Sequence, residues 1–144
     1  MRIAFLLIAA IMMVSCHKSQ RTEEIKNEIF QVEKAFEKMA TEKGIAEAFY
    51  FFADEDAVIK RGNDSLITGK ENIKLFYGKI NNAGTTVNWS PDFIDIARDG
   101  SLAYTYGKYV WKIKNEAGIS TEHKGVFHTV WKKQKDNSWK YVWD

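Results

Sequence analysis

Cysteine and proline each occur once in this chain of 144 residues, and neither sign of charge dominates. The formal net charge is +2, so no strongly basic stripe indicates a nucleic-acid partner, and we expect none. No internal repeat or low-complexity segment is present. Hydrophobic residues make up 45% of the whole chain and aromatic residues 14%, which is enough apolar material for the core of one small domain.

The single cysteine closes an apolar N-terminal segment. Arg2 is followed by an apolar run over residues 3–14, and then by Ser15 and Cys16. A run of this length is typical of a signal-peptide core and is too short to span a bilayer as a mature helix. Residues 13–16 (MVSC) are similar to a lipobox, in which the cysteine receives a diacylglyceryl group, although methionine stands where leucine is more usual.

We therefore expect a signal peptide over 1–15, a lipidated Cys16 with a tether over 16–21, and one folded domain over 22–144. The alternative is an ordinary cleaved signal peptide with an incidental cysteine. Lipidation would leave no free thiol for a disulfide or for nucleophilic catalysis. The protein would then be attached to a membrane through the lipid on Cys16. Because His17, and not aspartate, follows the cysteine, we expect anchoring in a bacterial outer membrane, facing the periplasm.

The first half of the domain has helical periodicity. Apolar residues spaced four and three apart predict a helix over 22–43, and a second, shorter helix follows over 45–52. After a hairpin over 56–67, Thr68 and Glu71 form a capping box that predicts a third helix. A polar loop over 81–85 follows it.

The second half has the period of strands. One strand runs over 87–96 with a bulge or an edge at Pro91, and Asp99-Gly100 predicts a turn into a strand over 102–114 that bends at Gly107. A turn over 115–118 and further strands over 119–134 and 139–144 complete four antiparallel strands. This order predicts an α+β fold with helices on one face of a curved sheet.

Five segments, in this order and spacing, resemble the nuclear-transport-factor-2-like superfamily, which includes SnoaL-like proteins and ketosteroid isomerases. They are 52–58 (FADEDAV), 68–77 (TGKENIKLFY), 99–107 (DGSLAYTYG), 130–134 (VWKKQ) and 137–140 (NSWK). The last two are most similar to a subfamily of exported bacterial proteins. The resemblance implies a cone-shaped, curved antiparallel sheet of four long strands plus a short hairpin, with three N-terminal helices packed in its concave face. It also implies a homodimer formed through the outer face of the sheet.

Ketosteroid isomerases use an aspartate base, with a tyrosine and a protonated acid as oxyanion donors. When their first half is placed on this chain without a gap, the tyrosine position is Phe36, the base position is Lys60, and a supporting tyrosine is Tyr77. The late-strand acid falls near His128. Since the base and the main donor are absent, we do not expect steroid isomerisation by this mechanism.

His123 and His128 are five residues apart, so on a regular strand they point to opposite faces, and we expect neither a shared metal site nor a cofactor. The family register places the side chains of His128 and Val130 inside the cone. Lys60 is either a desolvated amine with basic character or an ordinary solvated lysine. No catalytic residue is assigned, and the candidates are Lys60, His128 and Tyr77. The residues expected to line a ligand pocket are Phe36, Phe52, Lys60, Tyr77, Trp89, His128 and Val130.

All five tryptophans lie on predicted strands together with several tyrosines. Such aromatic surfaces pack a core, bury a hydrophobic ligand, stack on sugar rings or form a subunit interface. Three hypotheses follow. The domain is a non-catalytic module that binds a small hydrophobic or aromatic molecule, a homodimeric interaction domain, or a cofactor-free isomerase, cyclase or lyase of the SnoaL-like kind.

Overall fold

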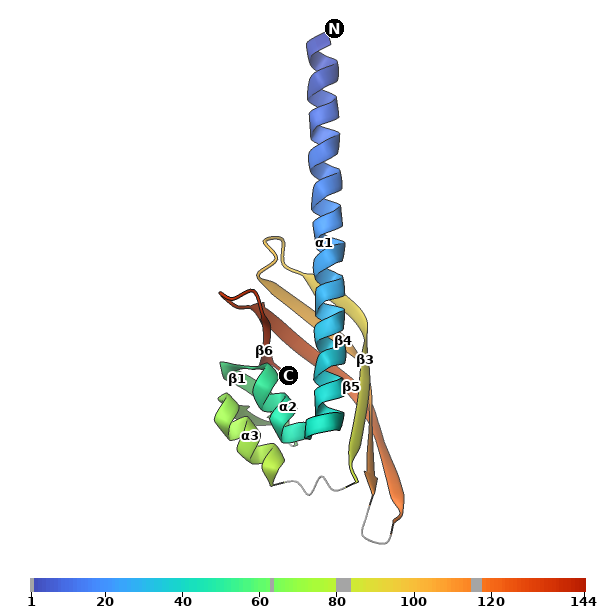
Figure 1. The fold of residues 1–144 in the computed structure, drawn as a ribbon, viewed down its shortest axis with the longest axis vertical. Coiled ribbons are helices and arrows are strands. Elements are labelled where there is room, and N and C mark those ends of the chain that lie inside the picture. The colour runs from blue at the N-terminus through green and yellow to red at the C-terminus, as the bar shows by residue number, and fades with distance from the viewer. Residues whose placement is uncertain (1, 63, 80–83, 115–117) are drawn as a thin grey trace.

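The computed structural model describes residues 2–62, 64–79, 84–114 and 118–144. Helices and a hairpin come first along the chain, and four further strands follow, of which the first three are long and the last is short (Figure 1). The elements are α1 (Arg2–Lys43), α2 (Ile45–Phe52), β1 (Ala53–Arg61), β2 (Ser65–Thr68), α3 (Lys70–Gly78), β3 (Thr86–Ile96), β4 (Leu102–Lys114), β5 (Ser120–Lys133) and β6 (Trp139–Trp143). The predicted α+β fold is confirmed.

The strands form one curved, mixed sheet in the order β2-β1-β6-β5-β4-β3. Neighbouring strands are antiparallel except β1 and β6, which run parallel. This parallel pair joins the predicted hairpin to the four later strands. It also brings the end of β1 next to the end of the described chain, where Lys60 N–H donates to the Asp144 main-chain oxygen at 2.9 Å.

The expected helix over 22–43 is the C-terminal part of α1, whose N-terminal half stands clear of the sheet (Figure 1). Among the residues of α1 whose surroundings the structure describes, Ile25 is the first buried one. Across the described ranges, no helix combines the length and the apolar character needed to cross a bilayer.

The core lies between the three helices and the concave face of the sheet. Phe36 of α1 is its centre, with ring centroids 4.8 Å from Phe49 of α2 and 5.0 Å from Trp89 of β3. The apolar face predicted for α2 is confirmed, because Ile45, Ala48, Phe49 and Phe52 are all buried. On α1, the buried face includes one residue that apolar periodicity did not select, Glu33.

The backbone corrects one local prediction and confirms another. The third helix is preceded by Gly69, with φ of 85° and no side-chain cap, so the predicted capping box from Thr68 is wrong. The irregularity near Pro91 is confirmed as a register shift in β3, and Gly107 of β4 pairs with Pro91 there. A Cβ on Gly107 would lie 2.1 Å from the Ser90 carbonyl oxygen, which is why glycine is required.

Some predictions concern residues outside the described ranges. They are part of the loop over 81–85 and most of the turn over 115–118.

Candidate functional site

A cavity of about 580 Å³ lies between the helices and the sheet, and its lining residues come from all three helices and from β1, β3, β4, β5 and β6. Ligand pockets commonly measure about 300–1,000 Å³. Most of its walls are apolar and aromatic. The lining residues are Phe36, Phe49, Lys60, Arg61, Gly62, Phe76, Tyr77, Val87, Trp89, Tyr109, Trp111, Val126, Phe127, His128, Thr129, Trp143 and Asp144.

One end of this cavity is polar. Arg61, at the end of β1, pairs through Nη2 with Oδ1 of Asp144, and its Nη1 donates to the Asp144 main-chain oxygen at 3.2 Å. Arg61 Nε donates to the hydroxyl of Tyr77 on α3 at 2.7 Å, and Thr129 Oγ1 of β5 donates to Asp144 Oδ2 at 3.0 Å. Four elements of the fold therefore meet at one ion pair.

The charges of this polar end are fixed at neutral pH. Burial by itself lowers the pKa of Arg61, but the charges and hydrogen bonds of Asp144 and Tyr77 together outweigh it, so the net shift is upward. Burial raises the pKa of Tyr77 further above its ordinary value, only partly offset by Arg61. Arg61 therefore stays cationic and Tyr77 stays a neutral phenol.

Behind the cavity wall, a buried carboxylate holds α1 to the sheet. Glu33 is 1% exposed, and its Oε1 accepts hydrogen bonds from Thr105 Oγ1 at 2.5 Å and Trp131 Nε1 at 2.9 Å. Its Oε2 accepts from Trp89 Nε1 at 2.8 Å. Burial raises the pKa of Glu33, and the three donors lower it by less. Glu33 does not line the cavity, so its contacts assign it a structural role.

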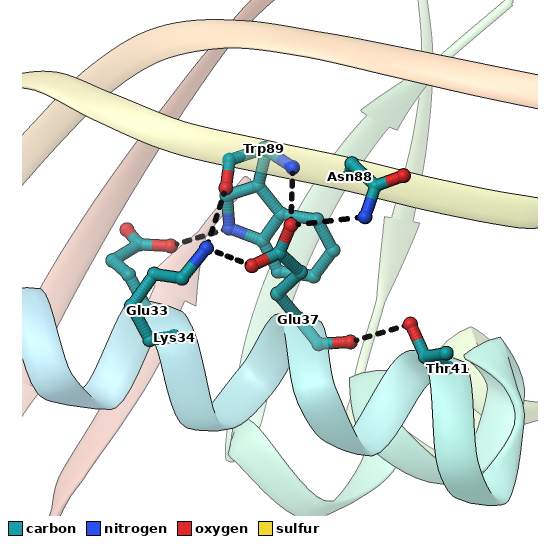
Figure 2. Close-up of polar contacts among 6 residues, drawn as sticks. All are labelled: Glu33, Lys34, Glu37, Thr41, Asn88 and Trp89. Carbon is teal, nitrogen blue, oxygen red and sulfur yellow. Dashed lines mark hydrogen bonds and ion pairs between the residues drawn. The ribbon is translucent and has the colours of Figure 1, made fainter.

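Figure 2 shows the next turn of α1 reinforcing this attachment. Glu37 Oε1 accepts from the Trp89 backbone N–H at 3.0 Å and from the Asn88 amide at 3.3 Å. Lys34 pairs with Glu37 and reaches the Trp89 carbonyl oxygen at 3.4 Å. These contacts fix Trp89, and through it one aromatic wall of the cavity.

The structure gathers most of the predicted pocket residues around the cavity. Phe36, Lys60, Tyr77, Trp89 and His128 all border it. Phe52 is buried in the core, with its ring centroid 5.0 Å from that of Phe36, and is not among the lining residues.

The expectation that His128 and Val130 face into the cone is wrong for their side chains. On β5 the alternate residues Thr129 and Trp131 are buried against the helices, so His128 and Val130 point to the outer face. His128 lies with its ring 5.9 Å from Tyr104 on that face. The family register misplaced this strand by one residue, which exchanges its two faces.

Lys60 is a solvated lysine in an ion pair. Its side chain is 52% exposed, and Nζ lies 2.6 Å from Oδ1 of Asp64. The structure therefore gives no sign of a desolvated amine. Within the described residues, no group of three or more histidine, cysteine, aspartate or glutamate side chains is arranged to hold a metal ion.

The outer face of the sheet has a second hollow and a patch of exposed aromatic and apolar side chains. The hollow measures about 500 Å³ and is bordered by β3, β4 and β5, including Tyr104, His128 and Val130. Phe93 stacks on Tyr106 at 5.0 Å between ring centroids. The outer patch comprises Phe93, Leu102, Tyr104 and Tyr106, which are 37–42% exposed.

Sequence reasoning missed Glu33, Arg61 and Asp144. Glu33 had one signal, because it lies four residues after Ile29 and three before Phe36, on the predicted apolar face. Nothing in the sequence indicates that Arg61 and Asp144 meet, since they pair only through the parallel β1–β6 contact.

No protein-family model matches the sequence, and no curated protein matches it either. Solved structures with the same fold do match. An ntf2-like protein with a cystatin-like fold from Novosphingobium aromaticivorans has a TM-score of 0.69 and 16% identity, covering 95% of this chain and 84% of that one. A ketosteroid isomerase-like protein from Erwinia carotovora has a TM-score of 0.65 and 13% identity, covering 81% and 90%. The association domain of CaMKII from C. elegans has a TM-score of 0.69 and 14% identity, covering 85% and 95%.

These likenesses define the class of fold. The chain has the nuclear-transport-factor-2-like fold, an α+β cone whose relatives in structure include isomerase-like and association domains. The fold by itself assigns no function, which has to be argued from the site.

Proposed function

We propose that this protein is an envelope lipoprotein whose cone-shaped domain binds a small hydrophobic or aromatic molecule. The observation that carries the binding function is the cavity of about 580 Å³, walled by aromatic rings and closed at one end by the Arg61–Asp144 ion pair. Such a cavity gives a ligand a large apolar contact area, and its few polar groups orient the ligand.

Native mass spectrometry of residues 17–144, exported to a periplasm and purified gently, tests this function. We expect an additional non-covalent mass on the wild type. Val87→Phe adds a ring to a buried wall of the cavity and should abolish that mass. Val110→Phe makes the same change on the other face of the sheet and should retain it, because Val110 does not line the cavity. Loss in both variants, or in neither, would contradict the proposal.

The anchoring part of the proposal has support from α1. Its first described buried residue is Ile25, so removal of residues 1–15 takes away none of the described core contacts. A lipid on Cys16 would then hold the domain at the membrane.

Intact-mass analysis of the protein from a diderm bacterium tests the anchor. We expect an N-terminus at Cys16 that carries acyl chains, their loss in Cys16→Ser, and their retention in the control Ser19→Ala. Membrane fractionation should place the wild type in the outer membrane and His17→Asp in the inner membrane. An unmodified Cys16, or a mature N-terminus elsewhere, would refute the lipoprotein.

A second candidate function, self-association through the sheet, is favoured by the outer patch. Phe93, Tyr104 and Tyr106 form an aromatic surface on β3 and β4 that the helices leave uncovered. Apolar surface of this kind commonly lies in protein interfaces. The fold is also that of an association domain, which fits a homodimer.

Sedimentation analysis at micromolar concentration decides this point. We expect a dimer for the wild type and a monomer for Tyr106→Lys, while Leu75→Lys, which changes an exposed residue of α3, should remain dimeric. A monomeric wild type would remove the second candidate and leave ligand binding unaffected.

The third hypothesis, a cofactor-free enzyme, has lost its supporting observations. Lys60 is ion-paired and solvated, and His128 points to the outer face. Tyr77 accepts a hydrogen bond from Arg61, whose guanidinium is a cation without an acceptor and therefore cannot serve as its base.

A further inference from the structure

Two aromatic residues of the cavity wall lie directly opposite two glycines. In the register of β4 and β5, Gly107 pairs with Phe127, and Tyr109 pairs with Gly125. Gly107 and Tyr109 follow the buried Thr105 by two and four residues, so both pairs are on the face of the sheet that the helices cover. Tyr109 and Phe127 both line the cavity. Each strand therefore supplies one ring and one glycine to the same part of the wall.

Each ring lies across the glycine that it faces. A Cβ on Gly125 would lie 2.5–2.8 Å from Oη, Cζ and Cε1 of Tyr109. A Cβ on Gly107 would lie 2.9 Å from Cε1 of Phe127. Side chains on a strand ordinarily stand roughly perpendicular to the sheet. A ring that lies over the neighbouring strand instead turns one face toward the backbone and the other toward the cavity.

The backbone gives no reason for a glycine at position 125. Its φ is outside the positive region that favours glycine, and the three atoms that a Cβ would meet first all belong to Tyr109. Gly107 differs, because the Ser90 carbonyl oxygen also excludes a Cβ there. A ring over a glycine stabilises a strand, but a larger residue at position 125 would do so without the ring. The glycine therefore makes room for Tyr109 to lie flat.

Tyr109 and Phe127 together form a flat part of the cavity wall, called here the ring floor. The helices supply the opposite wall, with Phe36, Phe49 and Phe76. Aromatic rings that stack on each other gain free energy beyond the area that they bury. A saturated ring system is puckered and has no π-electrons, so it gains only from the buried area.

We infer that the cavity selects planar aromatic ring systems over saturated ring systems of the same carbon skeleton, because the ring floor stacks on them. Tyr109 and Phe127 determine this specificity, and Gly125 is a positioning residue that acts through Tyr109. The inference rests on the proposed binding function and specifies its ligand class.

Two probes that differ only in their ring system test the selectivity. They are 2-naphthalenemethanol and trans-decahydro-2-naphthalenemethanol, which share one carbon skeleton, carry the same CH₂OH group and are both neutral at pH 7.5. Titration calorimetry of residues 17–144 should show the aromatic probe binding at least about tenfold more tightly. Equal or tighter binding of the saturated probe to the wild type would overturn the inference.

Replacement of both rings by leucine, in the double variant Tyr109→Leu and Phe127→Leu, keeps the floor apolar and removes its aromatic faces. The two probes should then bind within about threefold of each other. Phe51→Leu removes an exposed ring of α2 that does not line the cavity, and it should keep the wild-type preference. A tenfold preference that persists in the double variant would show that the ring floor is not its source.

Gly125→Ala tests the ring floor without replacing a residue that lines the cavity. The new Cβ displaces the Tyr109 ring, so the preference for the aromatic probe should fall at least about threefold. Gly78→Ala has open space around its Cβ and should leave the preference unchanged. An unchanged preference in Gly125→Ala would refute the positioning role of this glycine. Circular dichroism first establishes that each variant is folded, and if the double variant is not, Gly125→Ala and the wild-type order of the probes still decide.

Failure of the inference is distinguishable from failure of the proposed function. If neither probe binds while native mass spectrometry still shows a mass that Val87→Phe removes, the cavity binds a ligand and the inferred class is wrong. If that mass is also absent, the binding function itself fails.

Discussion

Replacement of Glu33 by methionine should strongly destabilise the domain. Methionine has a similar length and suits an apolar interior, so the cavity left behind is small. Its side chain accepts no strong hydrogen bond, so the donors on Trp89, Thr105 and Trp131 lose their acceptor. All three donors are buried.

The magnitude follows from those three donors. Each buried donor left without a partner costs about 1–3 kcal/mol, so the sum is about 3–9 kcal/mol. A domain of this size has a free energy of unfolding of about 5–15 kcal/mol. Glu33→Gln should cost less, about 1–3 kcal/mol, because the amide oxygen still accepts from Thr105 and Trp131 while the NH₂ group faces the indole N–H of Trp89.

Urea denaturation of residues 17–144, followed by tryptophan fluorescence and by circular dichroism, measures these differences. Glu42→Met makes the same substitution at an exposed position of α1 and should change little. Replacing the three donors as well, with Trp89→Phe, Thr105→Val and Trp131→Phe, should recover part of the loss, since no polar group is then left unpaired. If Glu33→Met unfolds within about 0.5 kcal/mol of the wild type, the structural role given to this carboxylate is wrong.

Further predictions concern pH, the ion pair and the bulge. Because the pKa of Glu33 is higher in the folded than in the unfolded chain, the stability difference between wild type and Glu33→Gln should favour the wild type most below the unfolded pKa. It should decline as pH rises through the folded pKa, as denaturation at a series of pH values will show. Arg61→Met leaves a carboxylate unpaired and should cost about 2–3 kcal/mol in urea denaturation, somewhat below the cost of breaking a fully buried ion pair. Gly107→Ala forces a Cβ against a carbonyl oxygen of β3 and should lower the melting temperature by several degrees.

Each of these has its own control. A pH profile for Glu33→Gln that parallels the wild type would show that Glu33 does not titrate differently on folding. Lys60→Met removes a solvated ion pair and should hardly change the free energy of unfolding. An equal loss of stability from Lys60→Met and from Arg61→Met would show that the buried pair stabilises the fold no more than the solvated one. Gly78→Ala has open space around its Cβ and should not destabilise, so a similar loss there would indicate a general intolerance of alanine.

The part of the fold that depends on local periodicity could be read from the sequence. The buried face of α2 and the bounds of β4 agree with prediction, because helical and strand periods are properties of neighbouring residues. The capping box predicted at Thr68 is wrong for the opposite reason. The backbone enters α3 through Gly69 at positive φ, a conformation that a pattern of side chains does not report.

The candidate site could be predicted from the sequence only in part. Aromatic residues such as Phe36 and Trp89 are predicted to line the cavity, and both do, because large apolar rings are commonly buried. Alternation also showed that His128 and Val130 share a face of β5. It could not show which face the helices cover, because both alternating sets on that strand contain apolar residues.

The sequence by itself determined the helices, the strands and the class of fold, since each depends on the spacing of apolar residues along one segment. Only the tertiary structure decided which polar groups meet. The donors to Glu33 come from residues 56, 72 and 98 positions away, and Arg61 meets Asp144 across the parallel β1–β6 pair. Such contacts depend on how distant segments pair and pack, and a buried charge is stable only where that packing brings its partners within hydrogen-bonding distance.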